Sequence, residues 1–284
     1  MNTVTQTYLR FPLARRIEHW VMMLSFTTLG LTGIPQKFST SNISISVIQA
    51  LGGIEVLRTI HHTAAVVLLL GSAWHLLVMG YSVFVLRDKL SMLPTLQDAK
   101  DGMHALFYNI GFAKTYPKMG RYTFEEKMEY WAFIWGTAVM TITGFLMWNP
   151  ITSTKYLPGE FVPAARAAHG GEAVLAVLAI LIWHMYGVHI KRQNKSMFNG
   201  KQTEQEMLHE HPLELADIKA GVIADRRPDA ATLRKRQMIY YPIAAILTVA
   251  MLGGIYGFIN IEETALKTVP PISQSVEATA TSAP

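Results

Sequence analysis

The chain of 284 residues contains no cysteine. Without a thiol it cannot form a disulfide, ligate an iron–sulfur cluster through cysteine, or attach a haem covalently. Charged residues are also sparse, at 16% of the chain, and half of all residues are hydrophobic. Soluble domains carry about 25% charged residues. These shortages exclude a disulfide-bonded secreted domain and an ordinary soluble one.

The hydrophobic residues gather in five runs, each near the roughly 20 residues with which a helix crosses a bilayer. The runs cover 17–35, 60–85, 129–149, 167–190 and 239–259. We therefore predict an all-α integral membrane protein, with a four-helix bundle over 17–190 and a fifth, C-terminal transmembrane helix over 238–259. No small-residue cleavage site follows the first run, so we expect it to be retained. We find no internal repeat of the kind that builds transporters from two halves.

Most basic residues lie in the chain's start and in the segments after the second and fourth runs. The positive-inside rule then makes residues 1–16 and 191–237 cytoplasmic, and the tail 260–284 lies outside, where its composition predicts disorder. The predicted location is the cytoplasmic (inner) membrane, multi-pass in lipid, with the N-terminus inside and the C-terminus outside. The net charge of +5 is spread over these loops, which excludes a nucleic-acid-binding face.

Two smaller segments of the cytoplasmic side also carry predictions. The stretch 98–110 could lie in the membrane interface as an amphipathic helix. The hydrophilic segment 191–237 is either a docking surface for a soluble subunit or a solvated linker.

Two of the runs each carry two histidines near opposite ends, His61 and His75 in one, His169 and His184 in the other. An ionisable residue at that depth is costly and marks a functional site. Spacings of fourteen and fifteen residues span roughly 21 to 23 Å of helix, so each run offers one imidazole near each membrane face. His61 and His169 share the outer layer, and His75 and His184 the inner one. The pattern predicts two stacked haems, each held non-covalently by two histidines.

The inner layer has a third candidate, because the first run, which passes from inside to outside, places His19 there. His19 and His75 compete as the partner of His184, and this surplus leaves room for a third haem. His62 lies about 100° round the helix from His61. We interpret His62 as a packing residue, and as an alternative ligand to His61 if the helix is rotated.

Basic residues near each layer are candidates for the haem propionates. Arg58 and Arg166 each precede an outer histidine by three residues, and Arg16 and Lys191 lie at the inner face. The alternative is that the arginines extend to lipid head groups. We expect Glu172, near His169, to be hydrogen-bonded within the outer pocket.

Several short motifs occur in a fixed order: RRIEHW (15–20), LTG (31–33), RTIH (58–61), EKMEYW (126–131), TGFLMWNP (143–150), HMY (184–186) and EHP (210–212). In this order and with these gaps they resemble the di-haem cytochrome b (gamma) subunit of formate dehydrogenases, over about residues 10–215. The resemblance implies two b haems with axial ligands His19, His61, His169 and His184. It also implies a quinone site in the inside loop before the third helix, here Tyr122, Thr123, Glu125 and Glu126.

The chain departs from that family at three places. Thr123, Glu125 and Glu126 stand where the family has Asn, Gly and Gln, so a carboxylate could transfer a proton to the quinone or cap the third helix. The family does not require His75, which instead resembles the second helix of the cytochrome b of quinol–cytochrome c oxidoreductases; we prefer His19. The fifth helix lies beyond the resemblance, so the partner need not be a formate dehydrogenase.

The predicted function is electron transfer in a respiratory oxidoreductase complex. Electrons pass between the quinone pool near the inner haem and a partner outside: a catalytic subunit, a multihaem cytochrome c or an iron–sulfur subunit. Two histidines per iron leave no open position, so the haems carry electrons rather than bind substrate. The alternative is a polytopic transporter or proton channel with a histidine relay, which would be colourless.

Overall fold

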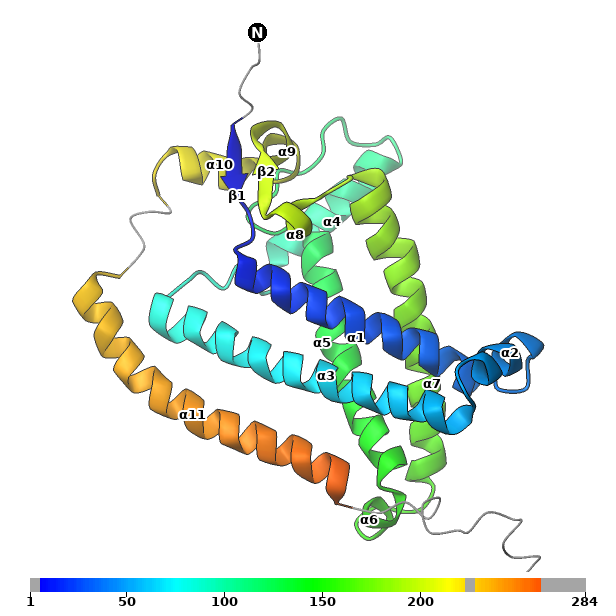
Figure 1. Ribbon diagram of the computed structural model, residues 1–284. Coiled ribbons are helices and arrows are strands. Elements are labelled where there is room, and N and C mark those ends of the chain that lie inside the picture. The colour runs from blue at the N-terminus through cyan, green and yellow to red at the C-terminus, as the bar shows by residue number, and fades with distance from the viewer. Residues whose placement is uncertain (1–5, 223–227, 262–284) are drawn as a thin grey trace, which may run out of the picture.

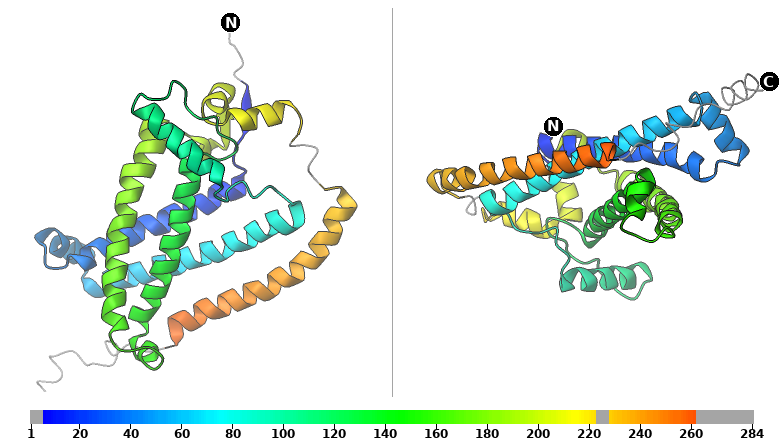
Figure 2. Two further views of the ribbon diagram at one scale, coloured as in Figure 1. Left: turned by 180° about the vertical axis from the view of Figure 1, so that it is seen from behind. Right: turned by 90° about the horizontal axis from the view of Figure 1, so that it is seen from below.

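The computed structural model describes residues 6–222 and 228–261, and it is helical throughout its long elements (Figure 1). Helices α1 (Leu13–Lys37) and α3 (Ile54–Tyr81) form one antiparallel pair, and α5 (Phe124–Trp148) and α7 (Phe161–Ala179) form a second. The second pair crosses the first, and α11 (Ala230–Asn260) lies along the side of α3 that faces away from α1 (Figure 2). The predicted all-α membrane class is confirmed.

The other elements are short and lie at the ends of these helices. Two π-helical segments continue the long helices: η1 (Ser82–Leu86) extends α3, and η2 (Ile180–Lys191) extends α7. The remaining elements are β1 (Thr7–Leu9), α2 (Asn42–Ala50), α4 (Leu96–Asn109), α6 (Pro150–Thr154), α8 (Ser196–Asn199), β2 (Lys201–Thr203), α9 (Glu204–Glu210) and α10 (Pro212–Lys219).

Four helices in the described part of the chain are long and apolar enough to cross a membrane: Ile54–Leu86, Phe124–Trp148, Phe161–Lys191 and Ala230–Asn260. They match the second to fifth predicted runs, but each begins several residues earlier than its run. Two of these helices, α5 and α11, begin at polar capping residues outside the apolar stretch, whereas α3 and α7 begin without a side-chain cap. The side chain of Thr123 accepts the backbone N–H of Glu126 at 3.1 Å, and that of Asp229 accepts the N–H of Thr232 at 2.9 Å.

Helix α1, the first predicted span, is less apolar than these four. Glu18, His19 and the threonines lower its hydropathy, although its 25 residues suffice to cross a bilayer. It lies along α3, where Val21 of α1 faces Gly71 of α3; a Cβ at residue 71 would lie 3.4 Å from Val21 Cγ1. That α1 crosses the membrane stays a prediction.

One end of the molecule is covered by a folded cap, made of β1, β2 and α8–α10, which Figure 1 shows gathered near the start of α1. Strand β1 pairs antiparallel with β2, and Tyr8 lies opposite Gln202. The linker interpretation of 191–237 is therefore wrong for most of this segment. Residues 223–227 of it, residues 1–5 and the tail from 262 lie outside the described residues.

A buried ion pair holds the cap together. Arg10, 2% exposed, donates to the carboxylate of Glu214, 4% exposed, and to the backbone carbonyl of Arg121. The guanidinium of Arg121 donates to the same carboxylate, and also to the carbonyl of Arg10 at 3.1 Å. Since a buried carboxylate is stable only when its oxygens are paired, Glu214 ties the N-terminal segment to the loop before α5. We call this side of the molecule the capped end.

Helix α4 coincides with the predicted amphipathic stretch 98–110. Thr95 and Asp98 form a capping box at its start. Its apolar side chains Leu96, Met103 and Leu106 are exposed, as expected of a helix that lies in the membrane interface. Asp98 also accepts a hydrogen bond from Lys127 at 2.7 Å, which fixes α4 to the first turn of α5.

Candidate functional site

His61 on α3 and His169 on α7 form a pair at the end of the helices opposite the cap, with ring centroids 6.5 Å apart. A threonine orients each ring: Thr32 Oγ1 lies 2.8 Å from His61 Nδ1, and Thr143 Oγ1 lies 2.9 Å from His169 Nδ1. Each hydroxyl also donates to the carbonyl oxygen four residues earlier, at 2.6 Å. Because a hydroxyl has one proton, it must accept from Nδ1–H. Both rings therefore keep the lone pair of Nε2 for a metal.

His19 on α1 and His184 on η2 form a second pair near the capped end, with ring centroids 6.3 Å apart. The carboxylate of Glu129, on α5, accepts from His184 Nδ1 at 2.8 Å. Here too Nδ1 is occupied and Nε2 is the nitrogen left for a metal. Nδ1 of His19 is buried and has no hydrogen-bond partner among the residues that the structure describes.

Both spacings fit two histidines on one iron. A ligating histidine nitrogen lies about 2 Å from its metal, and the ring centre about 1 Å further, so opposite ligands have centroids roughly 6 Å apart. Glycines face the rings of the first pair: a Cβ at Gly33 would lie 3.1 Å from His61 Cε1, and one at Gly144 would lie 3.6 Å from His169 Cε1. The residues fit haem. The described residues contain no group of three or more His, Asp or Glu suited to another metal.

His75, the rival of His19, has both ring nitrogens engaged elsewhere. Nδ1 lies 3.2 Å from Glu18 Oε2, and Nε2 lies 3.0 Å from the hydroxyl of Tyr130. This geometry favours His19 as the partner of His184. His62 stacks on Trp148 with ring centroids 3.8 Å apart, as expected of a packing residue.

Near the first pair, one of the two expected propionate partners already forms an ion pair with another residue. Arg58 donates to Glu55 at 3.1 Å in an exposed ion pair, and Arg166 lies one turn before His169 on α7. Sequence analysis missed a further cation, Lys37: its Nζ lies 2.8 Å from where a Cβ of Gly170 would be. The absence of a side chain at residue 170 admits this ammonium against α7, next in sequence to His169.

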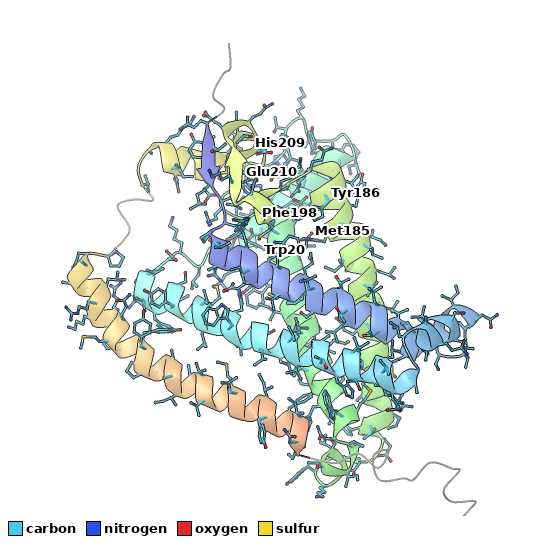
Figure 3. All side chains as sticks on the ribbon, in the orientation of Figure 1. Trp20, Met185, Tyr186, Phe198, His209 and Glu210 are labelled. Atoms are coloured by element: carbon cyan, nitrogen blue, oxygen red, sulfur yellow. The ribbon has the colours of Figure 1, made fainter. Side chains whose placement is uncertain are left out.

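Near the second pair, Arg16 donates to the backbone carbonyl of Phe198 in α8, and Lys191 ends η2. Phe198 packs edge-on against Trp20, with centroids 5.2 Å apart, where α1 meets the cap (Figure 3). His189 lies on the other side of Phe198, with centroids 6.0 Å apart. A cavity of about 450 Å³ opens here, lined by His189, Gln193, Asn194, Lys195 and Phe198.

Glu172 does not take the place we expected. Thr143 occupies His169 Nδ1, and the carboxylate of Glu172 lies against Gly136 of α5, where a Cβ would be 2.9 Å from Oε1. The expectation overlooked that a threonine on the facing helix α5 could meet the ring.

Two residues of the predicted quinone loop cap the N-terminus of helix α5. Thr123 and Glu126 make a reciprocal capping box, in which Glu126 Oε2 accepts the N–H of Thr123 at 2.8 Å. Arg10 lies 3.8 Å from the same carboxylate oxygen. Of the two roles weighed for the glutamates, Glu126 therefore has the capping one.

Glu125 and Tyr122, the other two residues of the predicted quinone loop, do not cap the helix. Glu125 pairs with Arg192 and accepts the hydroxyl of Tyr116 at 3.1 Å. Burial and the adjacent carboxylate raise the pKa of Tyr116 to about 12, so this hydroxyl stays a donor. The ring of Tyr122 faces the guanidinium of Arg10 at 5.3 Å.

The two helix pairs repeat one pattern of contacts. Fourteen residues separate Glu18 from Thr32 in α1 and Glu129 from Thr143 in α5, and a glycine follows each threonine. Glu18 bonds His75 as Glu129 bonds His184. His169 and His184 are fifteen residues apart, one more than His61 and His75. The π-helical turn of η2 accommodates the extra residue. The chain thus contains an internal repeat of helix pairs, which our sequence analysis did not find.

Comparison with known proteins points to the same chemistry. A family model described as prokaryotic cytochrome b561 matches residues 10–200. The cytochrome b556(Fdn) subunit of the nitrate-inducible formate dehydrogenase of Escherichia coli (strain K12) is 24% identical over 198 residues, which cover 69% of this chain and 85% of that protein. The cytochrome b556(fdo) subunit of formate dehydrogenase from the same organism is 22% identical over 210 residues, or 72% and 90%. The chain therefore belongs to the prokaryotic cytochrome b561 family, whose members are helical membrane cytochromes of the b type.

Proposed function

We propose that this chain is the di-haem electron-transfer subunit of a respiratory oxidoreductase in the cytoplasmic membrane. The observation that carries the proposal is the presence of two histidine pairs, one on α3 and α7 with centroids 6.5 Å apart and one on α1 and η2 with centroids 6.3 Å apart. His61 with His169 would hold one haem b, and His19 with His184 a second. Bound haem would carry single electrons, because two histidines would hold each iron and leave no position for a substrate.

The protein's part is to orient three of the four rings before the cofactor binds. Thr32 and Thr143 orient the rings of the first pair, and Glu129 orients the ring of His184. A carboxylate or hydroxyl acceptor on the far nitrogen fixes the tautomer and makes the histidine a stronger ligand. The cations Arg58, Arg166, Arg16 and Lys191 would meet the propionates, with Lys37 added at the first pair.

We place the capped end in the cytoplasm, because the basic segments lie there. A quinone would react at this end, against Tyr122, Thr123, Glu125 and Glu126. Glu125 lies one turn before Glu129 on α5, and Glu129 holds the ring of His184. Since Glu126 serves the helix cap, Glu125 is the carboxylate that would take up a proton from the cytoplasm and pass it to the quinone when quinone is reduced.

The partner would meet the opposite end of the bundle, on the outside of the membrane. The two relatives are named as subunits of formate dehydrogenases, which supports a catalytic partner subunit. A multihaem cytochrome c and an iron–sulfur subunit are the other proposed partners. Helix α11 lies beyond the range that the family model matches. Its contacts with a partner therefore need not copy those of formate dehydrogenase.

A dithionite-reduced minus oxidised spectrum of the purified chain, with a haem-to-protein ratio, tests this function. We expect a b-type band and a ratio of two. A colourless protein would favour the histidine-relay transporter. A ratio of one or three would contradict the two pairs.

A further inference from the structure

Three polar side chains near the capped end form a connected chain outside the haem pairs. Glu18 of α1 bonds His75 of α3 at 3.2 Å, and His75 bonds Tyr130 of α5 at 3.0 Å. In the internal repeat, Glu18 and His75 correspond to Glu129 and His184. Tyr130 corresponds to His19, so this trio occupies the place of a second inner ligand pair without forming one. The haem proposal leaves it without a role.

A cavity adjoins this trio, between α1 and α3. It measures about 320 Å³ and is lined by Ile17, Glu18, Val21, Gly71 and Trp74. This volume lies at the lower end of the roughly 300 to 1,000 Å³ of small-molecule sites. Four of the five lining residues are apolar, and Trp74, 56% exposed, lies where a ring could stack on it. We call this cavity the Glu18 pocket.

Glu18, the one polar residue of the pocket lining, has an unused hydrogen-bond acceptor. The side chain of Glu18 is 5% exposed. Its Oε2 accepts from Arg15 at 3.0 Å and lies 3.2 Å from His75 Nδ1, while Oε1 is buried without a hydrogen-bond partner among the described residues. A buried acceptor left unpaired costs about 1 to 3 kcal/mol. The pocket therefore suits a ligand that brings a hydrogen-bond donor.

The membrane around the pocket and the carboxylate of Glu18 limit the chemical class of the ligand. Because α3 spans the membrane, a ligand would enter from the lipid and must be largely apolar. A lipid acyl chain has no donor, and a lipid phosphate would be repelled by the carboxylate. A quinol has an apolar body, an aromatic ring that can stack on Trp74, and hydroxyl donors. Glu18 also directly precedes His19 in α1, so a ring in the pocket would contact the residue next to an inner haem ligand.

We propose that the Glu18 pocket is a quinol-binding site, distinct from the loop at Tyr122–Glu126, in which a quinol hydroxyl donates to Glu18 Oε1. The inference rests on the proposed quinone reaction near His19 and His184. His75, Tyr130 and Arg15 act as positioning residues, because they hold the carboxylate with Oε1 free.

Fluorescence quenching of a hydroxyquinoline N-oxide, a quinol analogue, by the purified haem-containing protein gives its affinity and stoichiometry. Val21→Phe fills the pocket without removing a polar group, and Trp74→Ala removes the stacking surface. We expect each to weaken binding at one site at least tenfold with haem content unchanged. The control is Leu24→Phe, a similar enlargement at an exposed position of α1 outside the lining.

Three outcomes would count against the pocket. Unchanged binding in Val21→Phe and Trp74→Ala, with binding lost in a variant of Tyr122, would overturn the pocket and leave the proposed function intact. Equal weakening in Leu24→Phe would also overturn it, since the effect would then not be local. A wild-type protein with two haems and no analogue binding would contradict both the pocket and the quinone part of the proposed function.

Discussion

Thr32 and Thr143 each have one hydroxyl proton, and the group that accepts this proton determines how the threonine contacts its histidine. The hydroxyl proton goes to the helix carbonyl four residues earlier, at 2.6 Å, so the oxygen is left to accept from histidine Nδ1. The same bond that bends or tightens a helix locally thus also sets which nitrogen of His61 or His169 faces the metal. A valine at either position keeps the shape and loses the acceptor.

Thr143→Val should raise the midpoint potential of one haem. The acceptor on Nδ1 makes His169 a stronger donor to iron and favours the oxidised state. Losing a hydrogen bond of about 1 kcal/mol corresponds to a shift on the order of 40 mV for one electron. Redox titration followed by absorbance measures it. Thr141→Val is the matched control, because Thr141 bonds only its own helix backbone; an equal shift there would refute the assignment.

His19→Ala should lower the haem-to-protein ratio from two to one, and His75→Ala should leave it at two. The reason is that His19 faces His184 at 6.3 Å between centroids, whereas both nitrogens of His75 are engaged by Glu18 and Tyr130. A pyridine haemochrome assay gives the ratio. Loss of haem in His75→Ala alone would exclude His19 as the inner ligand.

At the scale of elements, the cap depends on the buried Arg10–Glu214 pair. Arg10→Met should lower the free energy of unfolding of the cap by about 3 kcal/mol, the lower end for a broken buried pair, because Arg121 still contacts Glu214. Limited proteolysis within 191–222 would report the loss. Lys219→Met removes an exposed ion pair to Glu204 and should change nothing measurable. Equal sensitivity of the two variants would contradict the role of Arg10.

His211 should make the cap sensitive to acid. The side chain is fully buried and its Nδ1 donates to the carbonyl of Gly120 at 2.9 Å. Burial and the nearby Arg10 lower the pKa of His211 to about 3. Between pH 6.5 and 3 the unfolded chain binds a proton that the folded cap does not, so stability falls as pH falls, by roughly 2 kcal/mol at pH 5.

The test compares proteolysis of the cap at pH 8 and pH 5 in His211→Asn and in the wild type. Asparagine keeps a donor for Gly120 and does not titrate, so the variant should lose most of the pH dependence. His209→Gln, at an exposed position, should retain it. A variant as acid-sensitive as the wild type would exclude His211 as the cause.

At the scale of the whole molecule, the absence of cysteine allows the topology to be measured with single introduced thiols. Ser39, between α1 and α2, and Lys118, before α5, are both exposed and lie on opposite sides of the predicted membrane. In intact cells a membrane-impermeant maleimide should label Ser39→Cys but not Lys118→Cys. Labelling of both after lysis controls for reactivity. The reverse pattern would place the capped end outside.

The sequence by itself determined the membrane class, four of the long helices and the height of each candidate ligand. These properties are local: the length and hydropathy of a run set a span, and residue spacing times helical rise sets depth. The identity of His61, His169 and His184 as candidates followed from depth and motif alone. The starts of α5 and α11 were less well predicted, because their capping residues, Thr123 and Asp229, lie outside the apolar runs.

Only the tertiary structure decided which groups face each other. Spacing put His75 at the right height but could not show that Glu18 and Tyr130 engage both of its nitrogens. Likewise Thr32 meets His61 and Thr143 meets His169 across helices, at rotations that helix packing sets rather than sequence periodicity. The cap joins Arg10 to Glu214, 204 residues away. Local preference fixes a helix and its depth, whereas contacts between distant segments exist only once the helices pack.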